Sequence, residues 1–210
     1  MLESVIKIVN TGSTIPINMP NHVPFLRHRT TGLPKNWKAP VSDVNNWPRL
    51  VQLACLLYDE NGNQAAAADY IIKPDGYTIP AKSSRVHGIT NNRANEEGKP
   101  VHTVLQEFQS YLDQSSYLVA HNINFDEKIV GAEFLRAEMP IGLNGKKKIC
   151  TMKKSTNFCA IPGRYGPKWP KLGELHKKLF GTEFKEAHNA AVDIQATAKC
   201  FWELKKRGIL

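Results

Sequence analysis

Hydrophobic positions along the chain become regular only after about residue 22. The apolar stretch 50–58 (LVQLACLLY) predicts a buried β-strand, and the stretch 65–73 (AAAADYIIK) predicts a second strand. The Asn-Gly pair within Asp59–Asn63 separates the two strands and is a strong signal for a hairpin turn. We therefore expect an antiparallel hairpin early in the domain.

Helical spacing takes over in the second half of the chain. Val101, Leu105, Phe108 and Leu112 fall on one face of a predicted helix, and a short apolar strand follows at 117–120. A hairpin followed by helices that alternate with strands predicts an α/β fold, with a mixed sheet flanked by helices. Further helices are predicted over 125–138, 171–180 and 187–207.

Length and turn composition predict the domain organisation. Residues 1–22 contain scattered turn formers without a sustained period, so we expect a disordered tail there and a single domain over 23–210.

No apolar run approaches the roughly 20 residues of a membrane helix. The start of the chain lacks a signal-peptide pattern. The four cysteines form no C-x-x-C pair. These features predict a cytoplasmic protein with reduced thiols and no membrane partner.

The charge balance points to a polyanionic partner. The chain has 28 Lys and Arg residues against 19 Asp and Glu residues, a formal net charge of +9, which favours nucleic acid. The lysines at 146–148 and 153–154 either follow a phosphate backbone or belong to a solvated loop. Trp169 either stacks on a base or anchors the following helix in the core, and the core anchor is the favoured interpretation.

Two polar clusters carry the candidate chemistry. The segment His121–Asp126 (HNINFD) lies at a strand-to-helix junction, and His188–Asp193 (HNAAVD) lies at the start of the last helix. Such junctions bind ligands in α/β proteins, so Asp126 and Asp193 are expected to meet at one edge of the sheet. Carboxylates without cysteines suit Mg²⁺ or Mn²⁺, and two such ions can stabilise phosphodiester hydrolysis. His188 is a candidate base for the attacking water. Alternatively, these are ordinary helix-start residues and a surface histidine.

The order of four segments resembles the DEDDh 3′–5′ exonucleases, a family that includes the proofreading epsilon subunit of bacterial DNA polymerase III. The resemblance covers about residues 25–205. It implies a ribonuclease-H-like fold, two Mg²⁺ or Mn²⁺ ions, and release of nucleoside monophosphates from the 3′ end of single-stranded DNA. A DNA polymerase is a further implied partner. The four segments are Thr30–Pro34, Val86–Thr90, His121–Asp126 and His188–Asp193.

The resemblance also implies a role for individual residues. Asp126 and Asp193 would be metal ligands, and His188 would be the general base. The residues implied to bind substrate fall into two groups. Thr31, Gly32 and Leu33 would line the terminal-nucleotide pocket, and Asn122 and Phe125 would lie beside the substrate strand.

One departure from the family pattern changes the expected activity. The family's first motif runs Asp-x-Glu-Thr-Thr-Gly, whereas this chain has Arg27 and Arg29 at the two acidic positions. A guanidinium stays protonated, offers no lone pair to a metal, and repels cations. We therefore expect weak or absent metal binding and an impaired exonuclease. The alternatives are a non-catalytic nucleic-acid-binding or polymerase-associated module and, because the motifs do not read the 2′-hydroxyl, an exoribonuclease.

Two explanations for the arginines remain open. In a true pseudo-enzyme, the arginines would hold phosphates that metals once neutralised. In the favoured explanation, residues 1–29 are read out of frame. Leu26–Arg29 can be encoded as CTT CGA CAC CGA, and a shift of one base gives Phe-Asp-Thr and the start of Glu. One A lost from a run of A would account for the shift, and a wrong frame would also explain Pro24 within an expected core strand.

Overall fold

The computed structural model describes residues 22–184 and 189–210. Residues 1–21 of the predicted tail (1–22) and the candidate base His188 lie outside the described residues. The core is a five-stranded sheet in the order β3-β2-β1-β4-β5, with β1 at its centre. The hairpin pairs are antiparallel, and β4 runs parallel to both β1 and β5, so the predicted mixed sheet is confirmed. The strands are β1 (Val23–Thr30), β2 (Leu50–Tyr58), β3 (Gln64–Ile71), β4 (Tyr117–Ala120) and β5 (Lys147–Cys150).

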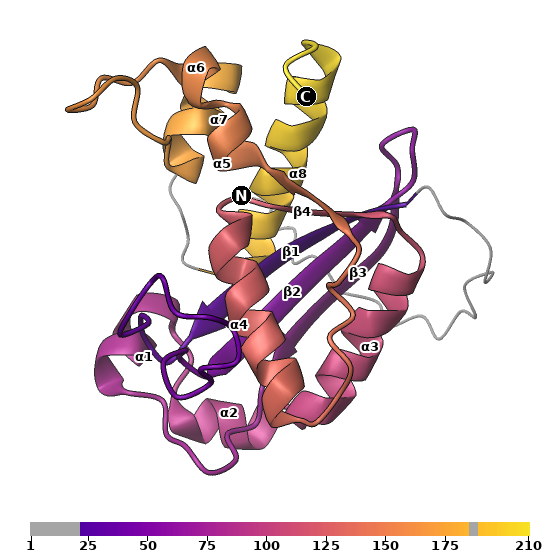
Figure 1. Cartoon of the computed structure of the whole chain (residues 1–210), viewed down its shortest axis with the longest axis vertical. Helices are drawn as coiled ribbons and strands as arrows, with labels where there is room; N and C mark the ends of the chain where they lie inside the picture. The colour runs from indigo at the N-terminus through magenta and orange to yellow at the C-terminus, as the bar shows by residue number, and fades with distance from the viewer. Residues whose placement is uncertain (1–21, 185–188) are drawn as a thin grey trace, which may run out of the picture.

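Helices cover both faces of this sheet (Figure 1). Helices α3 and α4 pack on one face, where Leu26, Leu53 and Phe108 belong to one hydrophobic cluster. Helix α8 packs on the other face against Phe25 and Ala54. None of the described helices is long and apolar enough to cross a membrane. The helices are α1 (Ala81–His87), α2 (Asn91–Glu97), α3 (Val101–Asp113), α4 (Ile123–Arg136), α5 (Thr151–Lys154), α6 (Thr156–Cys159), α7 (Leu172–Phe180) and α8 (Ala190–Lys206).

Strand β1 fixes where the candidate site lies. Phe25 faces α8 and packs edge-on against Phe201, with 5.2 Å between ring centroids, while Leu26 faces the α3 and α4 side. Because side chains alternate along a strand, Arg27 and Arg29 point to the α8 side and His28 to the α4 side. Pro24 lies within β1 opposite Leu57, so the chain continues the central strand through this proline. The strand thus places the Arg27 and Arg29 side chains beside the start of α8.

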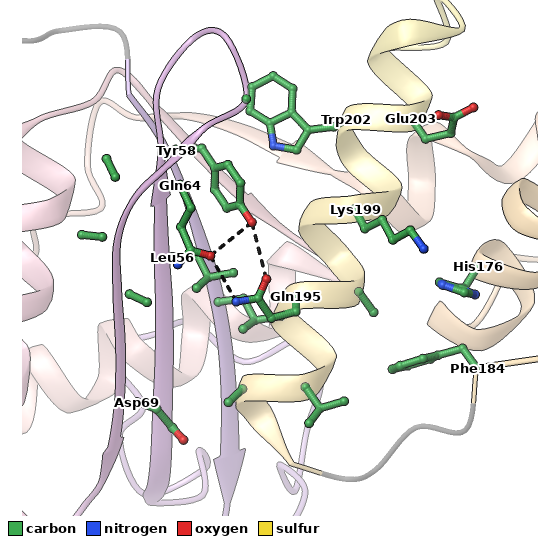
Figure 2. A pocket seen from close by; sticks show the side chains of 18 of the residues that line it. Leu56, Tyr58, Gln64, Asp69, His176, Phe184, Gln195, Lys199, Trp202 and Glu203 are labelled. Carbon is green, nitrogen blue, oxygen red and sulfur yellow. Dashed lines mark hydrogen bonds between the residues drawn. The ribbon is translucent and has the colours of Figure 1, made fainter. Parts of the chain in front are cut away.

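A groove of about 1320 Å³ separates the edge strand β3 from α8 and α7 (Figure 2). Three polar side chains bridge its floor: the Gln195 Nε2 group donates to Gln64 Oε1 at 3.2 Å, and the Tyr58 hydroxyl lies 3.5 Å from Gln195 Oε1. Lys199 and Lys206 also line the groove. Asn189 and Val192 at the start of α8 line this groove, whereas Asp193 and the two arginines of β1 do not.

Candidate functional site

The site forms where the end of β1 meets the start of α8. Asp193 lies in the first turn of α8 and its side chain is fully buried. Arg27 places its Nη2 atom 3.4 Å from Asp193 Oδ2, and Arg29 forms an ion pair with the same oxygen. The other oxygen, Oδ1, has no hydrogen-bond partner. The carboxylate of Asp193 is therefore held by two guanidiniums through one oxygen.

The second predicted carboxylate, Asp126, lies in the first turn of α4 and is also buried. Neither of its oxygens has a hydrogen-bond partner, and His28 Nε2 lies 3.4 Å from Oδ1. Burial raises the pKa of Asp126 to about 7, although Arg27 and Arg29 act in the opposite direction. Burial, together with the same two arginines, lowers the pKa of His28 to about 3. Near neutral pH, His28 is therefore uncharged and supplies no counter-ion to Asp126.

These residues do not fit the pair of divalent cations that the resemblance implies. Mg²⁺ and Mn²⁺ need several oxygen ligands around each ion. Among residues 22–184 and 189–210, no group of three or more His, Cys, Asp or Glu side chains is placed to hold a metal ion. Asp193, one of the two available carboxylates, is already paired with Arg27 and Arg29. The orphaned oxygens of Asp126 leave a single buried acid without the other ligands that a cation requires.

The predicted substrate-binding residues surround the end of β1. Asn122 precedes α4 in the left-handed region, with φ of 77°, and lies four residues before Asp126. Phe125 is half-buried, and its ring centroid lies 5.0 Å from those of both His28 and Trp37. Asn122 and Phe125 thus flank the buried acid.

The segment that follows β1 carries the other three predicted substrate residues. The Thr31 N–H donates to the Arg49 carbonyl at 2.9 Å, and the Arg49 N–H donates to Thr31 Oγ1 at 3.0 Å. Gly32 is half-buried, and Leu33 is 72% exposed. Roles for Thr31, Gly32 and Leu33 stay predictions. Their position after β1, with an apolar side chain free to contact a ligand, suits a terminal base.

His121 belongs to a predicted polar cluster, and the structure gives it a bonding role. Its Nδ1 lies 3.0 Å from Thr151 Oγ1, and its Nε2 lies 3.1 Å from the Pro170 carbonyl oxygen. Burial lowers the pKa of His121 to about 4, so the ring is neutral at neutral pH. A neutral ring donates to the carbonyl through Nε2 and accepts from the threonine hydroxyl through Nδ1. His121 thereby joins the end of β4 to the segments around α5 and α7.

Sequence reasoning missed Glu133, which is buried in α4 behind the substrate-binding segment. Its Oε1 accepts from Arg49 Nε at 3.0 Å, from Arg136 Nη1 at 2.8 Å and from the Leu50 N–H at 2.9 Å. Arg49 is the residue whose backbone pairs with Thr31. Glu133 gave no sequence signal, because one acid in a helix looks like a surface residue until its partners are known.

Comparison with known families identifies the domain. A sequence model of the exonuclease family, of the RNase T type, matches residues 30–201. The chain belongs to this family of DEDDh 3′–5′ exonuclease domains. The match begins at Thr30, directly after Arg29, so it does not include the two arginine positions. The family uses divalent metals, whereas the residues at this site do not form a metal centre.

Two similar proteins are much longer than this chain. The chain is 31% identical over 199 residues to the PolC-type DNA polymerase III of Streptococcus thermophilus strain LMD-9, which covers 95% of this chain and 12% of that protein. It is 33% identical over 138 residues to the PolC-type enzyme of Streptococcus pneumoniae strain D39, covering 66% of this chain and 9% of that protein. The chain therefore spans about an eighth or less of the length of these polymerases.

Solved structures confirm the predicted ribonuclease-H-like fold. The chain aligns with E. coli exonuclease I in complex with an oligonucleotide at a TM-score of 0.69 and 19% identity, covering 89% of this chain and 41% of that one. It aligns with the zinc-bound form of an exonuclease I–single-stranded DNA complex at a TM-score of 0.70 and 19% identity, with 90% and 41% covered. At this identity the comparison establishes the architecture of the sheet and helices.

Proposed function

We propose that this domain descends from a metal-dependent 3′–5′ exonuclease that releases nucleoside monophosphates from single-stranded DNA. We further propose that the chain as written is impaired in hydrolysis. The observation that carries this proposal is that Arg27 and Arg29 both pair with Asp193, a residue that the resemblance assigns to metal binding. Membership of the exonuclease family supports the lineage.

Charge explains why the arginines impair the reaction. The family pattern gathers four carboxylates, which attract divalent cations. Here, two permanently charged guanidiniums pair with Asp193 and their charges also act on Asp126, whose pKa is raised to about 7 by burial. The site therefore carries a net positive charge at neutral pH, and a Mg²⁺ or Mn²⁺ ion would have to displace Arg27 and Arg29 from Asp193. Coulomb repulsion between cations opposes that exchange.

A reversion experiment tests the proposal. The purified chain and the double variant Arg27→Asp/Arg29→Glu are incubated with a 5′-labelled single strand and Mn²⁺, and shortening is followed on a sequencing gel. Metal stabilisation of a phosphoryl transition state is worth several kcal/mol, so the double variant is expected to gain about 10²-fold or more in rate. Asp193→Asn added to the double variant should remove the gain. Equal activity of the parent chain and the double variant would overturn the proposed impairment.

A second candidate function is a non-catalytic module that binds nucleic acid. Arg27 favours it, because its side chain is 21% exposed and so is accessible to a bound strand. A guanidinium in that state can donate to a phosphate oxygen. Retention of a labelled strand without shortening, weakened by Arg27→Ala, would support this module over the impaired enzyme.

We propose that the arginines arise from a reading-frame error within residues 1–29, with the domain starting at about residue 23. The match to the family model begins at Thr30, where the shifted frame would rejoin, whereas the alignment with the Streptococcus thermophilus polymerase covers 95% of the chain and therefore includes most of residues 1–29. Pro24 removes a backbone donor from the central strand β1, which is an unusual place for a proline and is the structural observation that motivates the proposal. Sequencing the coding DNA across codons 20–32 on both strands tests it. Uninterrupted arginine codons at Arg27 and Arg29 would refute it.

We propose a DNA polymerase as the partner, because the PolC-type relatives contain the matching segment within much longer polymerases. DNA is the proposed substrate, since E. coli exonuclease I shares the fold and has been solved with single-stranded DNA. An exoribonuclease is the alternative, and parallel assays on DNA and RNA strands of one sequence distinguish the two. Faster shortening of RNA by the double variant would favour the exoribonuclease.

A further inference from the structure

Nearly all of the net positive charge comes from one continuous segment. Residues 139–173 contain eight Lys or Arg residues and no Asp or Glu, so they contribute +8 to the formal net charge of +9. Three of these cations already have partners within the chain. Lys146 donates to two backbone carbonyls, and Lys148 and Lys168 each pair with a glutamate. The excess charge is therefore concentrated on the other cations of the segment.

Two exposed aromatic rings accompany these cations. Tyr165 is 89% exposed and Trp169 is 59% exposed, so the favoured prediction that Trp169 anchors the core is wrong. The neighbouring Pro170 is buried in its place, which leaves the indole outside. Arg164 lies 5.1 Å from the Tyr165 ring centroid, and Lys153 Nζ lies 5.5 Å from that of Trp169. We call the following residues the basic aromatic surface: Lys153, Lys154, Arg164, Tyr165, Trp169 and Lys171.

The loop between α6 and α7, which carries Arg164, Tyr165 and Trp169, projects away from the body of the domain (Figure 1), and α5 carries Lys153 and Lys154. The Lys168 N–H donates to the Ile161 carbonyl at 2.9 Å and closes the loop. Gly163 packs so closely that an added Cβ would lie 2.7 Å from the Gly166 carbonyl oxygen. A loop closed in this way holds its rings in a limited set of positions, which lowers the ordering cost when a ligand binds.

The basic aromatic surface adjoins the candidate site through His121. This histidine contacts the Pro170 carbonyl, directly after Trp169, and the Thr151 hydroxyl, two residues before Lys153. His121 directly follows β4, and β4 pairs in parallel with β1, the strand that carries Arg27. A strand that ends at Arg27 and Asp193 would therefore leave the site toward Trp169 and Lys153.

We propose that the basic aromatic surface binds single-stranded DNA on the 5′ side of the terminal nucleotide. This inference rests on the proposed function only in placing the 3′ end at Arg27 and Asp193. Exposed aromatic rings stack on unpaired bases, and cations at the edges of those rings neutralise phosphates. In a duplex the base faces are already stacked on one another, so the surface selects single strands.

Fluorescence anisotropy with a 5′-labelled dT strand of about 12 nucleotides, within the site sizes known for single-strand binding, tests this proposal in EDTA. Because Trp169→Ala removes a ring on which a base can stack, it is expected to weaken binding about tenfold. Trp169→Phe retains a ring and should restore most of the affinity. Lys153→Ala/Lys154→Ala should lower the slope of log affinity against log salt by about 0.7 for each phosphate that the lysines no longer neutralise.

Lys206→Ala is the matched control, because Lys206 is an exposed cation on the groove beside β3 and should not affect binding. Parent-like binding by Trp169→Ala would overturn the proposal, and so would an equal loss caused by Lys206→Ala. An equal loss by Trp169→Ala on duplex DNA would also overturn it. If Arg27→Ala weakens binding and Trp169→Ala does not, the strand binds at the end of β1 without this surface, and the proposal of the surface alone fails. If neither the parent chain nor Arg27→Asp/Arg29→Glu binds any strand, both proposals fail.

Discussion

Glu133 is predicted to stabilise the domain by holding the segment after β1 against α4. Its Oε1 accepts three hydrogen bonds, two from guanidiniums and one from the buried Leu50 N–H. Among the described residues, Glu133 is the only anion that pairs with both Arg49 and Arg136. Glu133→Ala removes this anion and also leaves the Leu50 N–H without its acceptor. Both the unpaired guanidiniums and the unpaired N–H destabilise the packing of the segment after β1 against α4.

The size of this loss follows from the burial of the partners. Removing one member of a buried ion pair costs about 3–5 kcal/mol, and an orphaned buried N–H costs about 1–3 kcal/mol. Arg49 and Arg136 keep 26% and 16% side-chain exposure, so water can partly solvate them after the substitution. We therefore expect Glu133→Ala to lower the free energy of unfolding by about 4 kcal/mol, the lower part of the combined range.

Urea unfolding followed by tryptophan fluorescence measures this change. With a slope of about 2 kcal/mol per molar urea, the midpoint should fall by about 2 M. Glu133→Gln keeps an acceptor for Leu50 and should lose about half as much. The control is Glu97→Ala, which removes an exposed pair with Arg93 and should cost about 0.5 kcal/mol or less. A Glu133→Ala midpoint no lower than that of Glu97→Ala would refute the reasoning.

Three further predictions concern stability, each measured by the urea midpoint. The pKa of His121 is about 4 in the folded chain and 6.5 in the unfolded chain, so the unfolded chain binds a proton at a higher pH than the folded chain does. The free energy of unfolding should therefore fall by about 3 kcal/mol as the pH drops from 6.5 to about 4. His121→Asn should lack this part of the pH dependence. Gly88 ends α1 with a φ of 74° and has open space around it. Gly88→Ala should therefore lower the free energy of unfolding by about 1 kcal/mol through backbone strain alone. Gly88→Asn should lower it by less, because asparagine adopts this backbone conformation more readily than alanine. Phe134 is fully buried in the core, so Phe134→Ala should cost about 3–5 kcal/mol, and a change below about 1 kcal/mol would contradict its core position.

Elements with strong local periodicity could be predicted from the sequence. The strands 50–58 and 117–120 have the predicted bounds, and α4 begins at Ile123, two residues before its predicted start. The short elements were missed, because α5 and α6 have four residues each and carry no measurable period. β5 was missed for another reason: its Lys147–Cys150 sequence is typical of a charged loop, and only pairing with β4 makes it a strand.

The sequence predicts the features of the candidate site that depend on residue type, and it does not predict those that depend on contacts between residues. Asp126 and Asp193 carry recognisable spacing, and the arginines at the first motif are visible at once. The pairing of Arg27 and Arg29 with one oxygen of Asp193 needs the register of β1 against α8. The exposure of Trp169 also had to come from the structure, because a tryptophan followed by proline suits a core anchor and a binding loop equally.

The presence of β1 at the centre of the sheet does not decide how the arginines arose. Phe25 and Leu26 anchor the strand on opposite faces, and this anchoring does not involve the residues at 27 and 29. Arg27 and Arg29 project to the α8 side, where Asp193 offers each a counter-charge, so the fold accepts cations at a place where the family has acids. Acidic side chains at the same positions would face Asp193 without a counter-charge, and only bound cations would relieve that repulsion. A metal-dependent gain of stability by Arg27→Asp/Arg29→Glu, absent in the parent chain, would therefore show the restored site before any hydrolysis is measured.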